Sequence, residues 1–531
     1  MAIQNAVDID RSPSHGSPSH SSPSHSTRSR ASTARAIISA AVLGVVALAA
    51  VALLPPLQTG GVLLGLSALY LTRRLVFSFT SAMFIIAGVV MFIPIRRYAI
   101  PSGLPFALEP YRVVLVAVIL AVTIALLIDP AFRWRRMRFG VPLAVYLGTL
   151  LLSIVVNIVS ITQQGLVSSS LGGVVNFLTI ISVLFLTRQL LATEKMVMGL
   201  LTFLAWAGGI VGFFAVVEKI THVNVFLMLD KFTPLIRLGD DAVALRSGGA
   251  RAFASAQHPI ALSVMMCMLV PIAIYLSKHG RWPRNMYNRR IVFTILTLLM
   301  FGGISAAISR TAVVVLGVMF LITLILRPYL AVTIGLLGLP ALFIGSLISP
   351  KIVASTLGSF FDVNSLIASQ YTSAGWGGAG RLADLSPAFS QVAQSPIFGT
   401  GFGTRIVVGD NANAFILDNH VLGTLLEAGA VGVVGLAVFI LYPPIRLLVY
   451  AFRAKADDKY TQLAFAIAIS AVGYATALFF YDAFGFMQTL LVLSMLLAVG
   501  IWVLEDAPRR QQSSTVTENQ DAAALASRSA P

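Results

Sequence analysis

The segment MVMGLLTFLAWAGGIVGFFAVV, residues 196–217, carries no charged side chain. A helix of about 20 mostly apolar residues crosses the hydrocarbon core of a bilayer, so this segment predicts a membrane-spanning helix. Similar segments follow one another along the chain, at residues 36–54, 60–72, 75–95, 111–128, 141–160, 171–187, 196–217, 259–277, 291–308, 311–327, 329–349, 430–449, 461–481 and 484–503. The pattern predicts an all-α polytopic membrane protein with about 12–14 transmembrane helices.

The composition agrees with this fold class. Of 531 residues, 57% are hydrophobic and 11% are charged, whereas soluble domains carry about 25% charged residues. The net charge is +16, from 37 basic and 21 acidic residues, but the basic residues lie mainly in short loops between apolar segments. Cytoplasmic loops have this distribution, so the charge does not indicate nucleic-acid binding. The single cysteine, Cys267, lies in an apolar segment, which excludes a disulfide framework and a thiolate metal cluster.

The basic loops orient the predicted spans. They contain Arg28, Arg30 and Arg35, then Arg133, Arg135, Arg136 and Arg138, then Arg188 and Lys195, then Lys278, Arg281, Arg284, Arg289 and Arg290, and last Arg453, Lys455 and Lys459. Because basic loops favour the cytoplasm, both termini are predicted to be cytoplasmic, and segments 218–258 and 350–429 to lie outside. Arg96 and Arg97 are the one conflict, since the count of spans places them outside.

The predicted organisation has five parts. They are a Ser/Pro/His-repeat tail at 1–35, transmembrane helices at 36–349 with an outer loop at 218–258, a large outer loop at 350–429, C-terminal transmembrane helices at 430–503, and a tail at 504–531. Both tails are polar, cannot bury a core, and are predicted to be disordered and cytoplasmic. The first apolar run is predicted to be a retained span rather than a signal peptide.

The outer loop 350–429 is an unusual insertion for a membrane protein, and loops of this length are usually functional or disordered. It contains GWGGAGRLADL at 375–385, in which Arg381 follows a glycine-rich run. Glycines allow close approach of a ligand to backbone N–H groups, and the arginine fork suits phosphate oxygens, so this motif could bind phosphate or pyrophosphate. The alternative is a flexible hinge in which Arg381 pairs with Asp384. The later GTGFG, 399–403, follows no strand and predicts a tight turn rather than a dinucleotide site.

Two further arginines lie at predicted outer boundaries of the membrane. Arg251 precedes the span 259–277, and Arg310 lies between two apolar runs in Ser309-Arg310-Thr311. A charge so close to hydrocarbon marks a functional site or an internal ion pair by default. The alternatives are interfacial snorkelling for Arg251 and a simple outer turn for Arg310.

The end of the outer loop carries candidate bases. Asp418-Asn419-His420 precedes apolar residues at helical spacing, in LDNHVLGTLLEAGAVG at 417–432. Asp418 could cap this helix, and either Asp418 or His420 could take a proton from a hydroxyl. His420 could also be a polar residue at the rim of the site. Metal-binding Asp-x-Asp pairs in outer loops, HExxH motifs and nucleophile elbows are absent, so we expect neither a metal ion nor a cofactor.

Together these motifs resemble the O-antigen ligase and polysaccharide polymerase superfamily, over about 170–510 and most strongly over 375–435. The resemblance implies a GT-C-like fold and a glycosyltransferase of the outer membrane face. Its donor would be a glycan on undecaprenyl pyrophosphate, its acceptor a glycan or glycolipid, and its donor-binding residues Arg251, Arg381 and Arg310. Ligases commonly have His-Asn where this chain has Asp418-Asn419, so the base is either Asp418 or His420. This difference favours a polymerase, or a ligase of other surface glycans.

The alternative function is a polytopic transporter or a flippase for lipid-linked glycans. A transporter is expected to have ionisable residues in the middle of its spans and an internal repeat. The sequence contains few mid-span charges and no clear repeat of spans. The large outer loop therefore favours the enzyme.

Overall fold

The computed structural model describes residues 48, 51–52, 55–56, 58–60, 63, 79–101, 107–128, 134–238, 245–246, 249–333, 335–336, 385–407, 412–415, 417–453 and 458–507. The predicted tail 1–35, most of the predicted spans 36–54, 60–72 and 329–349, and the segment 350–384 lie outside these residues. The chain forms two compact units, Met1–Leu71 and Thr72–Pro531. The described residues of the first unit are mostly helical, and Thr59 N–H donates to the carbonyl of Pro55.

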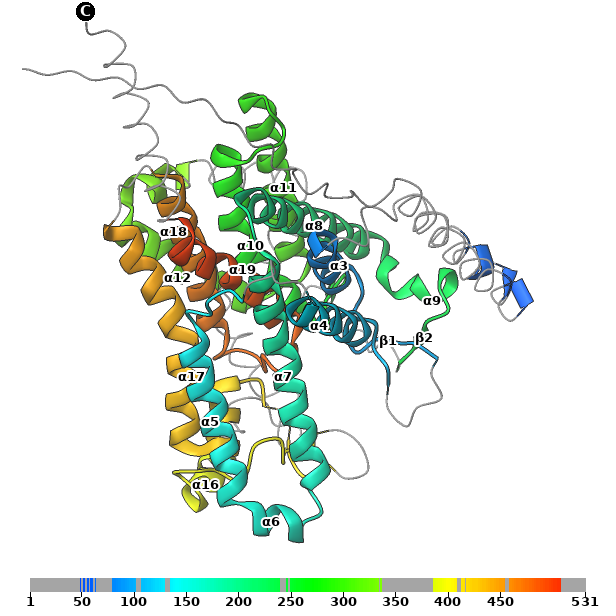
Figure 1. Ribbon diagram of the computed structural model, residues 1–531, viewed down its shortest axis with the longest axis vertical. Helices are drawn as coiled ribbons and strands as arrows, with labels where there is room; N and C mark the ends of the chain where they lie inside the picture. The colour runs from blue at the N-terminus through cyan, green and yellow to red at the C-terminus, as the bar shows by residue number, and fades with distance from the viewer. Residues whose placement is uncertain are drawn as a thin grey trace, which may run out of the picture. The chain divides into compact units, whose positions relative to one another are not determined.

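The second unit is built from helices, labelled in Figure 1. They are α3 (Phe79–Phe92), α4 (Pro110–Ile128), α5 (Gly140–Val156), α6 (Ile158–Gln163), α7 (Val167–Leu190), α8 (Glu194–Thr221), η1 (Val225–Met228), α9 (Leu229–Phe232), α10 (Pro259–His279), α11 (Met286–Ala306), α12 (Arg310–Leu326), α16 (Leu385–Gln394), α17 (His420–Arg453), α18 (Lys459–Ala477) and α19 (Gln488–Glu505). Two short antiparallel strand pairs join β1 (Tyr98–Ala99) to β2 (Ile236–Arg237) and β3 (Leu245–Arg246) to β4 (Gly249–Ala250).

Among the described residues, eight helices are long and apolar enough to cross a membrane: α4, α7, α8, α10, α11, α17, α18 and α19. Three more apolar helices, α3, α5 and α12, are shorter. The prediction of an α-helical architecture suited to a membrane is confirmed. Two boundaries differ from the prediction. The span predicted at 141–160 divides at Asn157 into α5 and α6, and the span predicted at 430–449 belongs to α17, which begins at His420.

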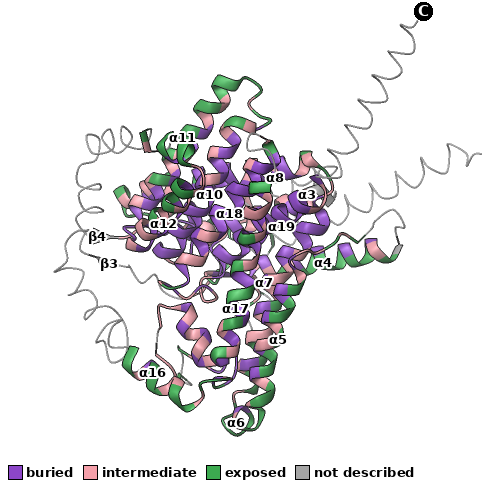
Figure 2. Ribbon diagram, turned by 90° about the vertical axis from the view of Figure 1, so that its left-hand side faces the viewer, coloured by how far each residue is buried: buried purple, intermediate pink, exposed green. Residues whose placement is uncertain are grey.

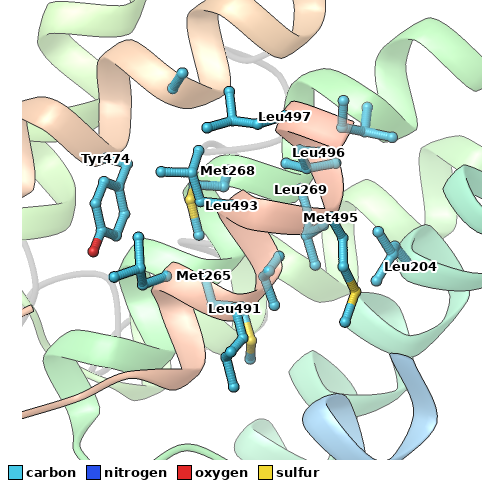
Figure 3. Packing of buried hydrophobic residues seen from close by; sticks show 14 of the residues in the cluster. Leu204, Met265, Met268, Leu269, Tyr474, Leu491, Leu493, Met495, Leu496 and Leu497 are labelled. Carbon is cyan, nitrogen blue, oxygen red and sulfur yellow. The ribbon is translucent and has the colours of Figure 1, made fainter. Parts of the chain in front are cut away.

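Helices α10, α18 and α19 form the centre of the bundle. In the apolar part of α19, 89% of the residues are buried, against 22% in α4, so α4 is a peripheral helix with a surface suited to lipid. Figure 2 shows the buried residues concentrated in this centre. In Figure 3, Leu493 and Met495 of α19 pack among residues of α8, α10 and α18. Packing of this kind holds membrane helices together, because lipid provides little hydrophobic driving force between them.

Close approach of backbones joins α8 to α11. A Cβ added to Gly303 would lie 2.9 Å from the Cα of Gly212, and one added to Gly212 would meet the carbonyl of Leu299. Small residues at helix crossings allow such contact in membrane proteins.

Ion pairs between connecting segments hold one end of the bundle, which we call the Arg188 end. The pairs are Arg188–Asp506 at 3.0 Å, Arg138–Glu505 at 3.0 Å, Glu194–Arg281 at 3.1 Å and Glu194–Lys459 at 3.1 Å. They join segments from four of the basic loops identified in the sequence. These loops therefore share one end of the bundle, as the span count predicts.

The opposite end, which we call the His420 end, contains Arg96 and Arg97. Strand β1, next to Arg97, pairs with β2 in the segment 218–258. The guanidinium of Arg97 lies 5.6 Å from the ring centroid of Phe253 in the same segment. The pKa of Arg97 is lowered by burial and further by the charge of Arg237. Arg96 and Arg97, which the span count places outside, therefore lie at this end together with Arg237.

Replacement of Asp506 by Ala should destabilise the protein, because Arg188 is only 1% exposed and would lose its anionic partner. Breaking a buried ion pair costs about 3–5 kcal/mol of unfolding free energy. Because Asp506 is partly exposed, we expect a loss of about 2–3 kcal/mol for Asp506→Ala. Glu505→Ala, at the more exposed Arg138 pair, should cost less than about 1 kcal/mol. Thermal unfolding in detergent measures both, and equal losses of Tm would contradict the ranking.

Candidate functional site

His420 is the first residue of α17, and three interactions fix its position. Its backbone N–H donates to the carbonyl of Leu478 at the end of α18, at 2.9 Å. Its Nδ1 lies 3.3 Å from the Oδ1 of Asp482. The helix start is capped by Asn419, whose Oδ1 accepts from Leu422 N–H at 3.0 Å. Asn419 therefore caps this helix, whereas the sequence indicates Asp418 as the candidate cap.

Asp482 lies in the connection between α18 and α19. Burial raises the pKa of Asp482, but hydrogen bonds from His420 and from the N–H groups of Phe484 and Gly485 outweigh it, so that pKa lies below its usual value. The carboxylate is therefore a stable acceptor for His420 Nδ1–H. In the tautomer that donates from Nδ1, the imidazole presents Nε2 as a proton acceptor. The His420 side chain is 8% exposed, and Nε2 is buried without a hydrogen-bond partner among the described residues.

Aromatic rings pack against His420, the buried member of this pair, whereas the side chain of Asp482 is 50% exposed. The Phe484 ring centroid lies 4.1 Å from that of His420 and 5.5 Å from that of Phe177. Tyr146 contacts Phe484 and Phe177, at 6.2 and 5.4 Å. Because Phe177 lies near the middle of α7, the His420–Asp482 pair lies at the level of the middle of that helix. The ends of α5 and α7 that α6 connects extend beyond it (Figure 1).

The glycine loop, Gly399–Gly403, is the predicted tight turn. Gly399, Gly401 and Gly403 have φ values of 65°, 111° and 75°, which favour glycine. The N–H groups of Thr400 and Gly401 donate to the carbonyls of Leu426 and Glu427, at 3.0 and 2.9 Å. The loop is thus joined to α17 just before the kink at Gly429.

Gly429→Ala should disrupt this junction. Gly429 has a φ of 65°, and a Cβ there would meet the carbonyl oxygen of Ile397. Strained backbone together with a clash should cost more than about 2 kcal/mol. Gly172→Ala is the matched control, because nothing lies within 4 Å of its Cβ position in a helix. Thermal unfolding should show a lower Tm for Gly429→Ala alone, and an unchanged Tm for it would refute the clash.

Arg405 and Glu427 lie beside the His420–Asp482 pair. Arg405 Nη2 donates to the carbonyl of Phe415 at 3.1 Å, and its guanidinium lies 5.4 Å from the ring centroid of Phe415. Burial lowers the pKa of Arg405, while the charges of Glu427 and Asp482 oppose that effect. The Oε2 of Glu427 accepts from Gly403 N–H at 3.4 Å. The site therefore combines an imidazole, a guanidinium and two carboxyl groups.

Arg251 and Arg310 both lie at the turn between α11 and α12. Arg251 Nε donates to the carbonyl of Ala307 at 2.9 Å, three residues before Arg310 begins α12. The following segment, Ala252–Ala256, is buried and non-helical. Glu218 accepts from two of its N–H groups, those of Phe253 at 3.3 Å and Ala254 at 2.7 Å. Irregular backbone inside a membrane bundle needs such partners.

The packing of α12 on α18 relates these arginines to His420. Arg327, just after α12, lies over Phe465 near the start of α18, while Met319 faces Gly473 nearer its end. The two helices are therefore antiparallel, and Arg310 lies toward the end of α18 that contacts His420. Asp418 lies two residues before His420, and Arg381 lies outside the described residues.

Asp482 was not identified from the sequence. It lies between the predicted spans 461–481 and 484–503, so it carries the same signal as Arg310, a single charge between two apolar runs. Within the described ranges, no three His, Cys, Asp or Glu side chains group closely enough to hold a metal ion.

No protein-family model matches the chain, and no curated protein matches it. The resemblance to the O-antigen ligase superfamily therefore stays a prediction. The function has to be inferred from the side chains at the His420 end.

Proposed function

We propose that this protein is a membrane glycosyltransferase that polymerises or ligates glycans carried on undecaprenyl pyrophosphate, for cell-surface polysaccharide synthesis. The supporting observation is the His420–Asp482 pair, with its buried Nε2 acceptor, at the same end of the bundle as Arg251 and Arg310. In this proposal the His420 end faces outward from the cytoplasmic membrane. The Arg188 end and both termini are cytoplasmic, as basic loops favour.

The proposed reaction is a single displacement. His420 Nε2 takes the proton of an acceptor hydroxyl as its oxygen attacks the anomeric carbon of the donor. A new C–O bond forms, the bond from the anomeric carbon to the pyrophosphate breaks, and undecaprenyl pyrophosphate leaves with inversion at the carbon. Asp482 keeps His420 in the required tautomer and stabilises the imidazolium that forms, as a carboxylate does in a catalytic triad.

Arginines supply the second requirement, which is charge stabilisation of the leaving group. A diphosphate is already a good leaving group, and positive charge fixed beside it lowers the barrier further. In this proposal Arg251, Arg310 and Arg381 bind the pyrophosphate, and the protein needs no metal ion for this task. The runner-up, a flippase, would move the same lipid without forming a glycosidic bond.

His420→Ala should lower transfer by about 10²–10⁴-fold, the usual contribution of a general base. Asp482→Asn should also lower transfer, because an amide can hold His420 in the wrong tautomer. Asp418→Asn is the matched variant and should keep most of the activity. Gel analysis of surface-glycan length and mass spectrometry of lipid-linked intermediates, in cells expressing each variant, measure the effects. Full activity of His420→Ala with loss in Asp418→Asn would reverse the assignment of the base.

Arg251→Ala and Arg381→Ala should both shorten surface glycans and cause the lipid-linked donor to accumulate, because each removes positive charge from the leaving group. Arg290→Ala, on the exposed start of α11 at the Arg188 end, is the control and should leave glycan length unchanged. Western blotting confirms equal membrane expression. Normal glycans without accumulated donor in both site variants would refute the pyrophosphate role, and accumulation on the cytoplasmic face would favour the flippase.

A further inference from the structure

We propose that Glu427 and Arg405 form a subsite for the acceptor glycan, next to His420. The inference rests on the proposed function, because it assigns the acceptor to the same site. It names the ligand chemistry as a sugar with neighbouring hydroxyl groups, bound between a carboxylate and a guanidinium.

The first part of α17 presents three polar side chains at helical spacing. His420, Thr424 and Glu427 are spaced by four and three residues, so they lie on one face of the helix. Seven residues of helix extend about 10.5 Å along the axis. All three precede the kink at Gly429, so they share one short rigid segment. The distance from His420 to Glu427 is therefore within the length of a short oligosaccharide, although Thr424 between them is buried.

Arg405 lies close to the same part of α17. Its Nη1 lies 3.9 Å from the Cβ position of Gly423, so its side chain runs beside the first turn of α17. Its charge interacts with both Glu427 and Asp482. Arg405 therefore lies along the path from the candidate base to Glu427.

The side chains of Glu427 and Arg405 can form further hydrogen bonds. Glu427 is partly exposed, and its carboxyl group accepts from the backbone N–H groups of Gly403, at 3.4 Å, and Arg405. A carboxylate accepts about four hydrogen bonds, and an arginine has five N–H donors in a planar fork. A sugar hydroxyl both donates and accepts, so adjacent hydroxyls can bond to the two side chains together. The rings of Phe415 and Phe484 add apolar surface at the same place.

A purely structural role would also use these contacts, because Glu427 binds the glycine loop that leads to Arg405. Asn413 separates the two roles. It holds the backbone that follows the glycine loop, through Ile406 N–H at 2.8 Å and the carbonyl of Thr404 at 2.9 Å, without lying on α17. Asn413→Ala should therefore loosen the backbone around Arg405 while the side chains of Arg405 and Glu427 themselves are kept.

The experiment compares Glu427→Gln, Arg405→Lys and Asn413→Ala in the full-length protein in detergent. The probe is a set of oligosaccharides released by mild acid from the surface glycan of cells that make the protein. Saturation-transfer NMR measures their binding, and transfer from the purified lipid-linked donor measures activity. We expect Glu427→Gln and Arg405→Lys to weaken oligosaccharide binding and raise the acceptor KM about tenfold, because charge-assisted hydrogen bonds are lost. The donor KM should not change, and Asn413→Ala should weaken oligosaccharide binding less than either of these variants.

Equal weakening by all three variants would show that loop stability is responsible and would overturn the subsite. Wild-type binding by Glu427→Gln and Arg405→Lys would overturn it as well. If wild-type protein binds the oligosaccharides through Glu427 but transfers nothing from the lipid-linked donor, the glycosyltransferase proposal fails while the subsite stands.

Discussion

The hydrogen bonds from the glycine loop to Leu426 and Glu427 are the interaction on which the His420 end depends. Inside a bundle of apolar helices, each backbone N–H and carbonyl needs a partner within the protein. At the kink of Gly429 the regular helical partners are interrupted, and the loop replaces them. Ser153 supports the junction, with its Oγ 2.8 Å from the carbonyl of Phe398 and 2.7 Å from that of Glu427. This junction orients the short segment of α17 that carries His420.

A second irregular segment satisfies the same constraint with a side chain. Ala252–Ala256 runs buried among the helices, and the carboxylate of Glu218 accepts two of its N–H groups. Arg251 and the glycine loop thus belong to two non-helical segments, each fixed by hydrogen bonds to a long helix. Both segments place polar side chains at the same end of the bundle without exposing unpaired backbone.

The sequence predicts the helical architecture well because apolar segments near the membrane thickness leave few alternatives. The span predicted at 259–277 matches α10 closely. The helix predicted to begin at Asp418-Asn419-His420 and the span predicted at 430–449 are one element, α17, which Asn419 caps and which continues across the kink at Gly429. The partner of His420 could not be paired from spacing alone, because Asp482 is 62 residues away in the chain. Only the packing of α17 on α18 brings the two together.

The position of His420 along α7 has a consequence for competition by water. From Val167 at the start of α7 to Phe177 at the level of the pair there are ten residues, about 15 Å of helix. Exposed apolar side chains cover much of that stretch, including Leu171 and Val175. His420 Nε2 itself is buried, although the Asp482 side chain is 50% exposed, so an acceptor hydroxyl that reaches Nε2 leaves little room for water beside the base. For the proposed reaction, this setting favours transfer to the acceptor over wasteful hydrolysis of the lipid-linked glycan.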